Sequence, residues 1–148
     1  MEDVRSVYPD LVEEEDGFYG PGDYRPLLYS MGYQVLVEED ERGYQGDSFI
    51  LFYDESGNHG EHDGKDQYGI LVFGWGSCSG CDALQACRNF KDIENLRRDL
   101  NESITWGSAS DQLRYFREHD WEGDWSGHSP ECKLWVLKCI EYLQKIVD

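Results

Sequence analysis

Two nearly continuous apolar runs in the middle of the chain constrain its fold most strongly. They lie within residues 48–53 and 68–75, and a third β-type run, residues 33–38, precedes them. Polar or glycine-containing connections separate the three runs, so three adjacent antiparallel strands are the most economical arrangement. The apolar character of the second and third runs indicates strands covered on both faces, or a sheet with helices packed across one face.

Three helices are predicted after the strands, because the apolar period shifts towards 3.6 residues beyond Cys81. Asn89 is the expected N-cap of the first helix, Ser108 of the second, and the Ser129-Pro130 pair marks the start of the third. The positions assigned to the core are Phe90, Ile93, Leu96 and Leu100 in the first helix, Leu113 and Phe116 in the second, and Cys132, Trp135, Val136, Cys139, Leu143 and Ile146 in the third.

This order of elements predicts an α+β fold with a three-stranded or larger antiparallel sheet followed by three helices packed on it. A chain of 148 residues fits one domain, assigned to residues 33–148. Residues 1–32 are acidic and rich in turn formers, and we expect an extended or partly ordered arm. The arm's aromatic residues are candidates for pinning it to the domain: Tyr8, Phe18, Tyr19, Tyr24 and Tyr29.

The net charge of −18 is the most unusual feature of the composition. Residues 1–66 hold 18 acidic and 4 basic side chains, net −14, whereas residues 67–148 hold 13 and 9, net −4. Such a charge excludes simple attraction to nucleic acid phosphates or anionic lipid and favours basic protein partners. No apolar stretch approaches the roughly 20 residues of a membrane span, and the first residues lack a signal-peptide pattern, so we expect a cytoplasmic protein.

Five cysteines in a reducing cytosol are expected to be thiols or metal ligands, with no structural disulfide. The spacing of Cys78, Cys81 and Cys87 makes these three a candidate zinc site. Cys132 and Cys139 are seven residues apart on one predicted helix, roughly 10 Å along its axis, so at most one of them can join that site. The alternative is that the cysteines are small core residues beside a tight turn built from glycine and serine.

The same segment resembles the active-site turn of the thioredoxin family, because a strand, Trp75, the Cys78-x-x-Cys81 pair and a helix start follow in that order. The resemblance covers about fifteen residues and implies that Cys78 attacks and Cys81 resolves. The family also has a βαβ start and a proline before a later strand, whereas the only later proline here is Pro130, at a predicted helix start. The GWGSCSGCDALQAC string, residues 74–87, is also similar to small, functionally uncharacterised proteins of phages and bacteria.

Two further segments combine residues with binding chemistry. Residues 54–66 gather carboxylates and two histidines and begin like a calcium loop, but Lys65 stands where the bidentate glutamate is needed, which favours a solvated hairpin loop. Near the end of the chain, Trp121 and Trp125 lie among acids, as in a packed turn or a partner-binding anchor. The paired carboxylates Glu118 and Glu122 are interpreted as surface residues.

The sequence therefore favours a non-enzymatic, acidic protein-interaction module that occupies a basic surface on a partner. In its narrow form the module is a phage-type inhibitor or nucleic-acid mimic acting on a nucleic-acid-binding protein. The alternative is a cysteine-centred zinc-binding or thiol-redox protein. No catalytic residue and no cofactor is assigned, zinc belonging to the alternative alone, and no direct binding to nucleic acid or membrane is expected. The candidate partner-binding residues are Glu13, Glu14, Glu15, Asp16, Glu38, Glu39, Asp40, Glu41, Trp121 and Trp125.

Overall fold

The computed structural model describes residues 2–43, 45–55, 67–78, 80–121, 123 and 129–148. Its strands are β1 (Gln34–Asp40), β2 (Gly46–Tyr53), β3 (Tyr68–Trp75) and β4 (Thr105–Gly107). They form one sheet in the order β1-β2-β3-β4, and each neighbouring pair is antiparallel. The predicted α+β fold is confirmed. The helices are α1 (Val4–Val7), α2 (Arg25–Tyr29), α3 (Phe90–Glu102), α4 (Ala109–Glu118) and α5 (Pro130–Val147).

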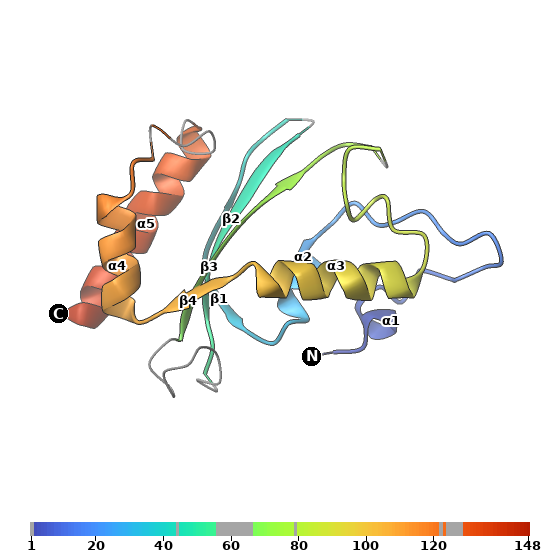
Figure 1. The fold of residues 1–148 in the computed structure, drawn as a ribbon, viewed down its shortest axis with the longest axis horizontal. Helices are drawn as coiled ribbons and strands as arrows, with labels where there is room; N and C mark the ends of the chain where they lie inside the picture. Colours follow the sequence, from blue (N-terminus) through green and yellow to red (C-terminus); the bar gives the residue numbers. More distant parts are fainter. Residues whose placement is uncertain (1, 44, 56–66, 79, 122, 124–128) are drawn as a thin grey trace.

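Helices cover both faces of the sheet. Figure 1 shows α4 and α5 on one side, and α1, α2 and α3 on the other. Alternation along β2 explains this arrangement, because successive side chains of a strand point to opposite faces. Ile50 and Phe52 pack in the cluster that includes α1–α3, while Phe49 and Leu51 pack with α4 and α5, and all four are buried. The nearly continuous apolar run therefore belongs to a strand covered on both faces.

The three predicted helix starts are confirmed by their caps. The side chain of Asn89 accepts a hydrogen bond from Asp92 N, that of Ser108 from Asp111 N, and that of Ser129 from Cys132 N. Each cap satisfies an amide that the first helical turn leaves without a partner. One predicted core position is wrong: Ile146 is 43% exposed, because the buried side of α5 ends at Leu143.

The N-terminal segment is more closely built into the core than an extended arm. It contains α1 and α2, and the hydroxyl of Tyr8 donates to the carbonyl of Asp23 at 2.8 Å. A helix of five residues such as α2 is too short to reveal itself by periodicity, since it shows scarcely more than one turn. Of the aromatics expected to pin the segment, Tyr8 and Tyr24 are buried, whereas Tyr19 and Tyr29 are exposed. The segment's buried apolar residues are Val4, Tyr8, Tyr24, Leu27, Leu28 and Met31.

Replacing Gly20 with alanine is expected to loosen the N-terminal segment. A Cβ at this position would lie 2.0 Å from the carbonyl oxygen of Leu84, a backbone atom that cannot rotate away. We expect a loss of about 1–3 kcal/mol in the free energy of unfolding, measured by urea denaturation. Gly22→Ala is the matched control, because a Cβ there meets no atom within 4 Å. Equal stability of the two variants would show that Gly20 does not approach Leu84 in solution.

Two further observations complete the fold. Strand β4 was not predicted, because three residues are too few for the alternation that marks a strand. It pairs with β3 through Ile70 and Thr105 and forms the second edge of the sheet. Among the described residues, none of the helices combines the length and apolar character that crossing a membrane requires.

Candidate functional site

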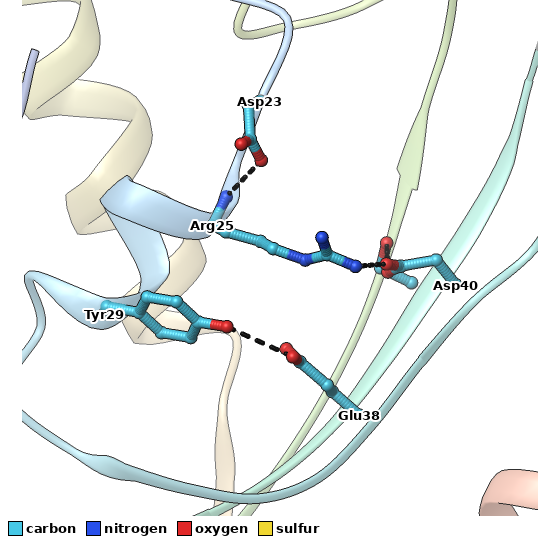
Figure 2. Close-up of polar contacts among 6 residues, drawn as sticks. Asp23, Arg25, Tyr29, Glu38 and Asp40 are labelled. Carbon is cyan, nitrogen blue, oxygen red and sulfur yellow. Dashed lines mark hydrogen bonds and ion pairs between the residues drawn. The ribbon is translucent and has the colours of Figure 1, made fainter.

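The acidic run at the end of β1 faces side chains from α2. Figure 2 shows Arg25 and Tyr29 extending from α2 towards Asp40 and Glu38. The Arg25 guanidinium lies 2.9 Å from the Asp40 carboxylate, and the Tyr29 hydroxyl donates to Glu38 Oε1 at 3.1 Å. The nearby carboxylate of Asp40 raises the pKa of Arg25. Two carboxylates of the acidic run, Glu38 and Asp40, are therefore bound by side chains of the protein itself.

The other carboxylates of this run also have internal partners. Glu39 accepts from Lys138 of α5 at 2.6 Å, and Glu41 accepts from Asp47 N at 2.7 Å. Of the four charges expected from the sequence, two thus face a cation, Arg25 or Lys138. Four carboxylates and two cations leave a formal charge of −2, half that of the isolated run. The sequence predicts a free acidic patch, whereas the structure has one whose carboxylates are held in place.

A groove of about 520 Å³ opens between this end of β1 and the first turns of α5. We call it the β1–α5 groove. Its lining combines charged side chains with Leu134, which is 45% exposed. Leu137, one turn further along α5, lies outside this lining and is 66% exposed. The residues that line it are Arg25, Glu38, Glu39, Asp40, Arg42, Pro130, Glu131 and Leu134.

The second predicted acidic segment, residues 13–16, lines a different groove together with Arg88 and Asn89. Glu13 Oε1 accepts a hydrogen bond from Phe90 N at 3.0 Å, at the N-terminal end of α3. A carboxylate is favourable there because the helix dipole and the unpaired amides attract negative charge. Glu13 therefore has a structural role, and the two acidic segments do not share one groove.

Trp121 is partly buried and packs against the core cluster formed by α4, α5 and the sheet. Its ring stacks on Phe116 at 6.0 Å and meets Trp135 edge-on at 6.0 Å, and its Nε1 donates to Phe116 O. Of the two alternatives for this residue, the packed turn is the one that the structure displays. Trp125 and Glu122 lie outside the described residues, as does most of the 54–66 loop.

Cys78 and Cys81 are joined in a disulfide, and both residues are exposed. The expectation that all five cysteines are thiols or metal ligands is therefore wrong for this pair. The Cys87 thiol is buried and donates to Ala83 O at 3.3 Å, and burial raises its pKa to about 11. Within the described part of the chain, no group of three or more Cys, His, Asp or Glu side chains is placed to hold a metal ion, and so Cys78, Cys81 and Cys87 do not converge on one.

Asp82, directly after the disulfide, is the residue that sequence reasoning missed. It is only 4% exposed, and its carboxylate accepts hydrogen bonds from three backbone amides and one hydroxyl. An aspartate that binds amides two and three residues ahead is a local turn signal, and Asp82-Ala-Leu-Gln is a sequence of that type. The four donors are Gly76 N, Leu84 N, Gln85 N and the Tyr24 hydroxyl, at 2.8–3.1 Å.

No family model, curated protein or solved structure matches this chain. The geometry of the described residues is therefore the basis for a functional proposal. Two places stand out: the β1–α5 groove, with its paired carboxylates and the exposed Leu134, and the disulfide turn formed by residues 76–78 and 80–82.

Proposed function

We propose that the protein is a non-enzymatic interaction module whose β1–α5 groove binds a basic surface of a partner protein. The observation that carries this proposal is that carboxylates and the exposed Leu134 line one groove, with the exposed Leu137 one turn further along α5. Interfaces between proteins typically combine an apolar centre with a polar rim, and an acidic rim selects a basic partner.

Electrostatics favour such a partner at two ranges. At long range, the net charge of −18 attracts a positively charged protein and speeds encounter, an effect that weakens as salt rises. At short range, Arg25 and Lys138 are paired with Asp40 and Glu39, so these two carboxylates already have a preferred orientation when a partner binds. Lysine or arginine side chains of a partner would share Asp40 and Glu39 with these two internal cations.

The apolar contribution comes from α5. Leu134 and Leu137 follow each other at i, i+3 on one side of the helix, and both are well exposed. Removing this apolar surface from water contributes about 25 cal/mol of binding free energy per Å². The partner segment that fits both features carries basic side chains for the β1 carboxylates and an apolar side chain for the leucines.

The narrow form of the proposal, an inhibitor that mimics nucleic acid, needs rows of free carboxylates that replace phosphates. The pairing of Glu39 and Asp40 with cations removes two charges from the best-defined row. The broader form, recognition of a basic protein segment, therefore has more support at this groove.

Neutralising Glu38 and Glu131 together as glutamines is expected to weaken binding of a fluorescent peptide of lysine and leucine residues. We expect roughly a fivefold rise in Kd at low salt, because each exposed charge contact contributes about 0.2–1 kcal/mol. Glutamine keeps the size of both side chains, so packing is retained. Fluorescence anisotropy against the wild-type chain gives the comparison.

The matched control for this measurement is Glu94→Gln with Glu102→Gln. Both residues are exposed on α3, on the opposite side of the sheet, and the change in net charge is the same +2. If the peptide binds at the β1–α5 groove, the control should change Kd by less than about twofold. If both double variants weaken binding equally, the peptide responds to total charge and the proposed groove is wrong.

A further inference from the structure

The cysteines of the disulfide turn are accessible to thiols in solvent. Among the five cysteines, Cys78 and Cys81 are exposed, whereas Cys87, Cys132 and Cys139 are buried. Thiol–disulfide exchange requires a thiolate to reach a sulfur atom, so access decides which cysteines react. We propose that Cys78 and Cys81 form a reversible dithiol–disulfide site that exchanges electrons with small thiols.

The position of the disulfide argues against a purely structural role. It joins residues only three apart in sequence. A crosslink restricts the unfolded chain more as the loop it closes grows longer, and this loop is close to the shortest that cysteines close. Breaking the bond therefore costs the fold little, as a site that opens and closes requires.

The turn is also held by contacts that do not need the disulfide. Cys81 N donates to Cys78 O at 3.1 Å, and the buried Asp82 carboxylate binds Gly76 N on the other side of the turn. Gly76 permits the close approach, because a Cβ there would lie 2.6 Å from Cys81 O and 3.0 Å from Cys81 Sγ. After reduction these contacts keep the two sulfurs adjacent, so the bond re-forms readily.

The two sulfur atoms are not equivalent. The amide of Cys78 donates to Cys81 Sγ at 3.0 Å and stabilises negative charge on that atom, while Cys78 O, 3.3 Å from the same sulfur, can accept its proton once the thiol forms. Cys81 is therefore the better leaving group when the disulfide is attacked. This asymmetry assigns Cys78 as the sulfur that a reducing thiolate attacks.

The reaction balances with two molecules of a small thiol. The first thiolate bonds to Cys78 Sγ, the Cys78–Cys81 bond breaks, and Cys81 leaves with the electron pair and takes a proton from water. The second thiolate attacks the small-molecule sulfur of this mixed disulfide, so that a small disulfide is released and Cys78 leaves as a thiolate, which also takes a proton from water. The protein gains two electrons and two protons, and the two small thiols are oxidised.

The test equilibrates the full chain with reduced and oxidised glutathione, followed by rapid alkylation and mass analysis of each cysteine. We expect Cys78 and Cys81 to alkylate at least about 100-fold faster than the three buried cysteines after reduction, and to close again in oxidised glutathione. An acid quench during reduction should find glutathione on Cys78 at least about fivefold more often than on Cys81. In Cys81→Ser the mixed disulfide on Cys78 should accumulate, because no second thiol displaces it.

Three results would overturn the proposal or its assignment. If oxidised glutathione does not close the pair in the folded protein, the site is not redox-active. If reduction abolishes the cooperative urea transition, the bond is a structural crosslink. If glutathione is found mainly on Cys81, the assignment of Cys78 as the attacked sulfur is wrong.

Discussion

Replacing Trp135 with alanine is expected to destabilise the protein by about 3–5 kcal/mol, the range for removing a large aromatic side chain from a core. Trp135 is fully buried on α5 and contacts the sheet through Phe49, with ring centroids 5.5 Å apart. It also meets Phe116 of α4 at 5.0 Å, and its Nε1 donates to Val37 O of β1. One side chain thus links α4, α5 and the edge strand of the β1–α5 groove.

Urea denaturation of Trp135→Ala measures this effect, and Leu137→Ala is the control on the same helix. Leu137 is 66% exposed, so its truncation should change the free energy of unfolding by less than about 0.5 kcal/mol. A loss for Trp135→Ala no larger than that of the control would mean that α5 does not pack on the sheet through this residue.

Replacing Asp82 with alanine is expected to cost about 3 kcal/mol of unfolding free energy, because a buried carboxylate disappears and its donors lose their acceptor. Those donors come from three parts of the chain: Gly76 at the end of β3, Leu84 and Gln85 in the following turn, and Tyr24 beside α2. Burial of the Tyr24 hydroxyl raises its pKa, so this group stays protonated and donates.

Asp82→Asn separates hydrogen bonding from packing. The asparagine side chain retains one acceptor oxygen, but an NH2 group replaces the other oxygen and faces backbone N–H donors. We therefore expect a loss of about 2 kcal/mol in the free energy of unfolding, between wild type and Asp82→Ala. Asp10→Ala is the control for removing an exposed carboxylate. Stabilities of both Asp82 variants within about 0.5 kcal/mol of this control would contradict the central place of Asp82 in the turn.

The predictable parts of the fold are those governed by local signals. Asn89, Ser108 and Ser129 bond amides three residues ahead, so their sequences alone locate the helix starts. Residues 68–75 form a nearly continuous apolar run over the length of a full strand, and β3 has these bounds. Helix α2 and strand β4 are too short for such a signal, and they form because the core supplies their contacts.

The candidate site was less predictable, because its geometry depends on long-range contacts. The sequence indicates that Glu39 and Asp40 are free surface acids. In the structure, Asp40 contacts Arg25 of α2, 15 residues away in sequence, and Glu39 contacts Lys138 of α5, 99 residues away. Asp82 binds Tyr24 across 58 residues. The disulfide was missed for another reason: the expectation rested on a reducing compartment, whereas hydrogen bonds around Cys78 and Cys81 bring the two sulfurs together.

The most direct test of the proposed interaction is an NMR titration of the labelled chain with the lysine–leucine peptide. Amide shift changes concentrated on residues 38–42 and 130–137, saturating with one peptide per chain, would place binding in the β1–α5 groove as proposed. Changes centred on residues 13–16, or spread evenly over the exposed acids of the described chain, would contradict a specific site on this surface.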